Sequence, residues 1–125
     1  MPIPFQIDPA SGVPFYRQVI DQVLGGLATG ALRPGEQLPT VRSLAVDLAV
    51  NPNTIARAYK ELEIRGVLAT QQGSGTFVAE QKVSIDEVER QRRLNQILDA
   101  FLAKAASQGL SLGEIQQALA EREVR

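Results

Sequence analysis

"VNPNTIARAYKELE", residues Val50 to Glu63, decides the fold, because its apolar side chains recur at the spacing of a helix with one buried face. They are Ile55, Ala58, Tyr59 and Leu62. The same stretch opens with short polar residues around Pro52, whose missing N–H costs nothing at the first position of a helix. Asn51 precedes it as an N-cap residue. The pattern predicts a helix whose first turn presents short polar side chains.

Immediately upstream, "TVRSLAVDLAV" (residues 40–50) predicts a second, shorter helix capped by Thr40. Its apolar positions Val41, Leu44, Ala45 and Leu48 share one face. A short helix, a turn of three to four residues and a longer helix form the unit that places a recognition helix in a DNA groove.

The flanking segments complete a small domain. Residues 14–30 predict a first helix, with Pro14 at its first position and an end near Gly30, and "LRPGEQLP" (residues 32–39) predicts a spacer or a lone strand. After Gly66, which suits the residue following a helix, "VLATQQGSGTFVA" (residues 67–79) predicts a two-stranded hairpin. A phosphate-binding loop at residues 73–75 is disfavoured, because no helix follows these glycines.

The remaining residues predict two further helices, each opened by a capping box, Ser84–Glu87 and Ser111–Glu114. The first carries an apolar stripe toward Gly109, at Leu94, Ile97, Leu98, Phe101, Leu102 and Ala105. About 46 residues are too few for a separate ligand-binding domain. We expect the stripe to pack on a second copy of the chain, or partly on the first helix.

The amino-acid composition excludes several kinds of site but does not by itself assign a function. The 125 residues contain neither cysteine nor histidine, which removes disulfides, thiolate metal sites and the commonest general base. The net charge is −1, and residues 1–79 carry six basic and six acidic side chains, so a basic surface has to be local. The N-terminus has no signal-peptide pattern and no apolar run is long enough to cross a membrane, so we expect a cytoplasmic protein without membrane partners.

The polar tip of the helix after Asn51 has the chemistry that a major groove requires. Asparagine can make bidentate contacts to adenine, and threonine can donate a hydrogen bond or touch a thymine methyl group. The candidates are Asn51, Asn53 and Thr54, followed one turn later by Arg57 and Lys60 on the face opposite the apolar residues. Taken singly, Asn51 is more often a helix cap, and a surface arginine or lysine is usually only solvated. The order of the elements favours the DNA-binding interpretation.

With these motifs in place, "LRPGEQLPTVRSLAVDLAVNPNTIARAYKELEIRGVLATQQGSGTFVA" closely resembles the DNA-binding domain of the GntR family of bacterial transcriptional regulators. The "NPNTIARAY" variant and the short helical tail resemble the YtrA branch of that family. The resemblance spans roughly residues 5 to 79. It implies an α+β fold in which a winged helix-turn-helix of three helices and a β-hairpin wing (residues 1–79) precedes a two-helix dimerisation region (residues 80–125).

The resemblance also implies roles for individual residues. Thr40 and Arg42 match the start of the family's second helix, which meets the DNA backbone. Asn51, Asn53 and Thr54 match the base-facing start of the recognition helix. The wing tip, which approaches the minor groove or phosphates, matches Gln72, Gly73 and Ser74.

Two positions depart from the family pattern. Many members carry arginine where this chain has Pro52 and again where it has Ala56, so contacts made by those arginines are not transferable. Arg57 replaces the second arginine, as in the YtrA branch.

By the same resemblance, the protein is expected to be a repressor that binds an inverted-repeat operator as a homodimer and associates with the nucleoid when bound. Leu94, Ile97, Leu98, Phe101 and Leu102 would form the dimer contact. The resemblance implies no cofactor. A small-molecule effector, where there is one, would act by altering dimer geometry; the sequence identifies neither an effector nor its pocket. The competing interpretations are a winged helix that binds protein as an adaptor and, least favoured, an enzyme.

Overall fold

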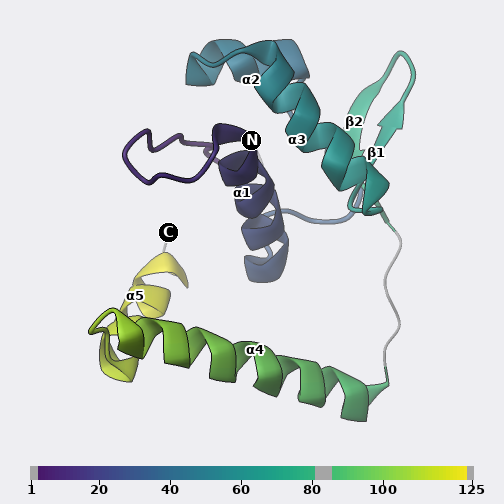
Figure 1. Cartoon of the computed structure of the whole chain (residues 1–125). Helices are drawn as coiled ribbons and strands as arrows, with labels where there is room; N and C mark the ends of the chain where they lie inside the picture. The colour runs from purple at the N-terminus through teal and green to yellow at the C-terminus, as the bar shows by residue number, and fades with distance from the viewer. Residues whose placement is uncertain (1–2, 81–85, 124–125) are drawn as a thin grey trace. The chain divides into compact units, whose positions relative to one another are not determined.

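The computed structural model describes residues 3–80 and 86–123 of the chain, and these residues contain five helices and one antiparallel hairpin (Figure 1). The chain divides into two units, Met1–Gln81 and Lys82–Arg125. The first contains α1 (Phe15–Thr29), α2 (Val41–Leu48), α3 (Pro52–Ile64), β1 (Leu68–Gln71) and β2 (Gly75–Val78). The second contains α4 (Glu87–Ser107) and α5 (Leu112–Glu123).

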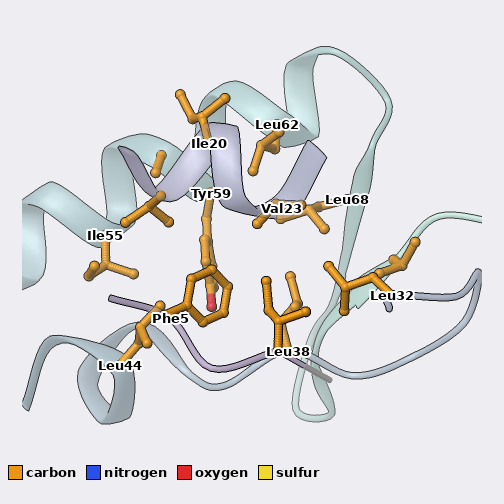
Figure 2. Packing of buried hydrophobic residues seen from close by; sticks show 14 of the residues in the cluster. Phe5, Ile20, Val23, Leu32, Leu38, Leu44, Ile55, Tyr59, Leu62 and Leu68 are labelled. Atoms are coloured by element: carbon orange, nitrogen blue, oxygen red, sulfur yellow. The ribbon is translucent and has the colours of Figure 1, made fainter. Parts of the chain in front are cut away.

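The core of the first unit lies where α3 packs against both α1 and α2 (Figure 2). All four apolar positions predicted for α3 are buried. They meet a face of α1 formed by Val19, Ile20 and Val23, and Leu44 and Ala45 of α2. Phe15, in the first turn of α1, is 38% exposed. This burial of α3 on two helices fixes the direction of its opposite, polar face.

Side-chain caps define the starts of α2 and α3. Thr40 accepts a hydrogen bond from the Ser43 N–H at 3.0 Å, and Asn51 accepts one from the Asn53 N–H at 2.8 Å. Both were the predicted N-caps. Pro14 lies one position before the first residue of α1 rather than at it. α3 ends at Ile64, and Gly66 (φ 79°) follows its C-cap residue Arg65. The Gly66 N–H donates to the Glu63 carbonyl, and the Val67 N–H donates to the Leu62 carbonyl.

Two glutamine side chains fasten the N-terminal segment to α1. The Gln22 carboxamide accepts from the Gln6 N–H at 2.9 Å and donates to the Gln6 carbonyl at 2.6 Å, as a neighbouring strand would. Gln18 does the same with Asp8 and also donates to the Val13 carbonyl. Ile3 and Phe5 enter the core from this segment. The N-terminal segment is therefore attached to α1 by these hydrogen bonds and to the core by its two buried side chains.

The hairpin pairs Leu68 with Val78 and Gln71 with Gly75, and it stands beside the end of α3 (Figure 1). The segment predicted as a spacer or lone strand runs along the free edge of β2. The Leu38 N–H donates to Thr76, the Val78 N–H donates to Glu36, and Gln37 forms a bridge with Phe77. β2 therefore has a neighbour on both sides.

In the second unit, α4 begins at Glu87 with Asp86 as its N-cap, because the Asp86 carboxylate accepts from the Glu89 N–H at 2.9 Å. The predicted cap at Ser84 lies outside the described residues. The second capping box is confirmed: the Ser111 N–H donates to the Glu114 carboxylate, and the Glu114 N–H donates to the Ser111 hydroxyl. A turn with Gly109 at φ 78° joins the two helices.

Candidate nucleic-acid interface

A three-residue turn, Ala49–Asn51, connects α2 to α3 and sets the angle between them. Ala49 adopts a left-handed conformation with φ 55°. The Val50 N–H donates to the Ala45 carbonyl at 3.0 Å, so the turn is bonded back onto α2. Together with the packing of α2 on α3, this geometry makes a helix-turn-helix, the arrangement that the sequence predicts.

The tip of α3 is polar and mostly open to solvent. Asn51 and Asn53 are exposed, and Thr54 is half-buried. The Asn51 side-chain oxygen is engaged in the cap, which leaves its amide group as a donor toward an acceptor on DNA. A bidentate adenine contact uses both the oxygen and the amide, so Asn51 is poorly suited to the base-reading role that the sequence predicts for it. The Asn53 carboxamide makes no hydrogen bond within residues 3–80 and 86–123 and keeps both groups available.

The basic side chains along this face are not neutralised by neighbouring acids. Arg42, Arg57 and Lys60 are all exposed, and none forms an ion pair within the described part of the chain. By contrast, the exposed arginines Arg17 and Arg65 each lie 3.7 Å from a carboxylate one helical turn away. α2 and α3 therefore carry three exposed basic side chains without an ion-pair partner among the described residues, although the chain as a whole carries a net charge of −1.

Arg57 has a partner that the sequence does not suggest. Its guanidinium carbon lies 3.8 Å from the centroid of the Tyr16 ring, which belongs to α1. Phe15 and Tyr16 form one wall of a shallow hollow of about 400 Å³, and Asn53, Thr54 and Arg57 form the other. Three of the predicted DNA-binding residues thus gather at a single hollow with the first turn of α1.

The start of α2 is held by the core. The Tyr59 hydroxyl donates to the Pro39 carbonyl at 2.8 Å, one residue before the Thr40 cap. Burial raises the pKa of the Tyr59 phenol well above its ordinary value, so the group stays protonated and remains a donor. Thr40 and Arg42 are exposed beside this anchored position. The predicted backbone-contacting residues therefore lie on a fixed helix terminus.

The predicted wing residues Gln72, Gly73 and Ser74 form the exposed loop of the hairpin, with Gly73 at φ 82°. Gln37 donates its side-chain amide to the Ser74 carbonyl at 2.9 Å. Gly75 adopts φ +122°, and a Cβ placed on it would lie 2.6 Å from that amide nitrogen. Gln37 fixes the tip, and because it lies 37 positions away in the sequence no local pattern indicates it.

Other kinds of site find no support in the described residues. No group of His, Cys, Asp or Glu within residues 3–80 and 86–123 is arranged to hold a metal ion. Over the same residues, no helix has the length and apolar character needed to span a membrane.

The five predicted tail residues lie on one stretch of α4. Leu94, Ile97, Leu98 and Phe101 are between 46% and 66% exposed, whereas Leu102 is half-buried. Ala105 is the one residue in the described part of this unit that is buried. Within the described part of its own unit, the apolar stripe on α4 is therefore largely uncovered.

Comparison with curated proteins shows two close similarities. The chain is 38% identical to the uncharacterised HTH-type transcriptional regulator YhcF of Bacillus subtilis over 84% of this chain and 86% of that protein. It is 47% identical to the HTH-type transcriptional repressor YtrA of the same organism, over 60% of this chain and 58% of that protein.

Solved structures show the same relationship. A transcriptional antiterminator from Listeria monocytogenes superposes with a TM-score of 0.68 at 29% identity, covering all of this chain and 92% of the other. The DNA-binding domain of AraR in complex with operator ORX1 superposes with a TM-score of 0.54 at 32% identity, covering 60% of this chain and 95% of that domain.

The profile of the family described as "Bacterial regulatory proteins, gntR family" matches residues 15–78, which span α1, the helix-turn-helix and the whole hairpin. The relatives named above are transcriptional regulators, not enzymes. With its winged helix-turn-helix, its exposed basic side chains on α2 and α3 and this match, the chain belongs to the GntR family of DNA-binding transcriptional regulators, with similarity to YtrA.

Proposed function

We propose that this protein is a repressor that binds an inverted-repeat operator as a homodimer, with residues 1–79 contacting DNA and residues 80–125 joining the two copies. The observation that carries the proposal is the tip of α3, where exposed Asn53 and half-buried Thr54 precede Arg57 and Lys60, which form no ion pair among residues 3–80 and 86–123. Similarity to the YtrA repressor, and to a domain seen bound to its operator, supports it.

In this proposal, contacts divide into two classes. Asn53 and Thr54 read base edges, because a short polar side chain at the start of a recognition helix reaches the floor of the major groove. The contacts to the sugar-phosphate backbone of DNA come from Thr40, Arg42, Asn51, Arg57, Lys60 and the wing tip Gln72–Ser74. Phosphate contacts set register and affinity without reading sequence.

A dimer is proposed because the contact of a single winged helix with DNA is small. One winged helix buries little surface on DNA, whereas two copies can occupy half-sites one helical turn apart, about 34 Å. The uncovered stripe Leu94–Leu102 on α4 is the surface that would join them, because large exposed apolar patches usually mark an interaction site.

The experiment that tests DNA recognition is selection of bound sequences from a random duplex pool by the purified full chain, at near-physiological salt. We expect an enriched inverted repeat. No enrichment from a folded dimer, together with an affinity that does not fall with rising salt, would favour the protein-binding adaptor instead, because a DNA-binding protein releases counterions when it contacts phosphates.

The dimer contact is tested separately with Phe101→Glu, which places a charge in the centre of the stripe. We expect a monomer by light scattering and weaker operator binding. Gln96→Glu is the matched control, because Gln96 is exposed on the opposite side of α4 and should leave the dimer intact. A Phe101→Glu protein that stays dimeric would refute the assignment of this stripe.

A further inference from the structure

The contact between Arg57 and Tyr16 joins the polar face of α3 to the first turn of α1. The guanidinium carbon lies 3.8 Å from the ring centroid, a separation at which the cation lies directly over the ring face. Nothing in the helix-turn-helix itself requires this contact, because α2 and α3 pack on each other without Tyr16. The contact adds a link between α1 and the polar face of α3 to the core packing of these two helices.

Tyr16 is the fixed member of the pair. It is half-buried against the core cluster and follows Pro14 at the start of α1. One turn later α1 packs on α3 through Val19 and Ile20, and Gln18 holds the preceding segment by hydrogen bonds to Asp8 and Val13. The ring therefore keeps its position relative to α3, whereas an unpaired arginine on a helix surface would sample many rotamers.

Stacking leaves the arginine free to bind. A guanidinium that stacks on an aromatic ring uses its face, while its five N–H donors lie in its plane and point outward. A bidentate ion pair with a carboxylate, such as the one that Arg92 makes with Glu89, would occupy two of those donors. Arg57 makes no ion pair within the described residues, so its position is restricted while its hydrogen-bonding capacity is kept.

We infer that Tyr16 is a positioning residue of the DNA interface, which holds the Arg57 guanidinium beside Asn53 and Thr54, ready to bind a backbone phosphate. This inference rests on the proposed function, in which Arg57 contacts DNA. It extends the interface from the helix-turn-helix to α1. The ring reduces the number of Arg57 conformations that are lost on binding, and the guanidinium supplies the contact itself.

The test is a double-mutant cycle on the full chain, with affinity for the selected operator duplex measured across a range of salt concentrations. Arg57→Ala is expected to weaken binding and to reduce the slope of log affinity against log salt by about one unit. Tyr16→Leu is expected to weaken binding by about two- to fivefold, the range for an exposed cation–π contact. In the Arg57→Ala background, Tyr16→Leu should have no further effect.

Two conservative variants distinguish a specific loss of DNA binding from a loss that is caused by misfolding. Tyr16→Phe retains the ring and should bind as tightly as the unaltered protein. Arg57→Lys leaves α1 untouched and retains the charge, so the salt slope should persist while affinity falls by a factor similar to that of Tyr16→Leu. Arg17→Ala is the matched control, because Arg17 is an exposed arginine of α1 already paired with Asp21; its affinity and slope should not change.

The outcomes distinguish a failure of the DNA contact assigned to Arg57 from a failure of the positioning role assigned to Tyr16. If Arg57→Ala leaves affinity and slope unchanged, the DNA contact assigned to Arg57 is wrong and the role of Tyr16 is wrong with it. If Arg57→Ala weakens binding but Tyr16→Leu weakens it further by the same factor in both backgrounds, only the positioning role is wrong. Tighter binding by Tyr16→Leu would show that the ring holds Arg57 away from DNA, and would also overturn the inference.

Discussion

Replacing Ala49 with glycine should stabilise the protein. Ala49 ends α2 in a left-handed conformation, φ 55° and ψ 44°, and it is the one non-glycine residue with positive φ in residues 3–80 and 86–123. Its N–H donates to the Val46 carbonyl at 3.2 Å, and its side chain is exposed. Removing the methyl group therefore sacrifices neither a hydrogen bond nor buried apolar area.

The size of the expected stabilisation follows from two opposing contributions to the free energy of unfolding. A side chain with a Cβ costs about 1–2 kcal/mol in the left-handed region, and glycine removes that cost. Glycine also gains about 0.4–1 kcal/mol of conformational freedom in the unfolded chain, which acts against folding. The balance is a net stabilisation of about 0.5–1 kcal/mol, which for a unit of this size raises the melting temperature by about 2–8 °C.

The assay is thermal and urea unfolding of the full chain at one fixed protein concentration, because oligomerisation makes the midpoint depend on concentration. Ala56→Gly is the matched control: Ala56 is also exposed, but it lies inside α3, where the same substitution should destabilise by about 1 kcal/mol. Opposite signs for the two variants are expected. A loss of stability in Ala49→Gly as large as that in Ala56→Gly would refute the argument from backbone strain.

Three other substitutions test the interface and its support. Arg42→Ala should weaken binding to all sequences and lower the salt slope by about one unit if Arg42 neutralises a phosphate; an unchanged slope measured by fluorescence anisotropy would count against that role. Asn53→Ala should relax preference at one base-pair position, at a cost of about 1–3 kcal/mol measured on a panel of single-base operator variants; a uniform loss over the panel would show that Asn53 only positions α3. Tyr59→Phe should lower stability by about 1 kcal/mol in urea unfolding, because the Pro39 carbonyl loses its donor; full stability would mean that water replaces the hydroxyl.

Features that depend on local sequence were predictable. The caps at Thr40 and Asn51, the left-handed Gly66 and the hairpin all follow from residue types within a few positions of each other, and the structure confirms them. The buried face of α3 was predictable for the same reason, because helical spacing fixes which side chains share a face.

Features that depend on residues far apart in sequence were not predictable. Nothing in "LRPGEQLP" indicates that Gln37 reaches the wing tip, because the two residues of that contact lie 37 positions apart, on either side of α2 and α3. The stacking of Arg57 on Tyr16 depends in the same way on the packing of α1 against α3. For Asn51, the sequence allowed both a cap and a base contact, and only the geometry shows that its oxygen is already engaged.

The strand neighbour that residues 35–38 provide for β2 has a consequence for the order of folding during synthesis. An isolated two-stranded hairpin is marginally stable in water, so β2 depends on a segment that left the ribosome much earlier. Pairing across that separation needs a large loop to close first, which the helices accomplish by packing. The wing should therefore be the last part of the first unit to fold, and a nascent chain stalled before Val78 should expose an unpaired strand edge to chaperones.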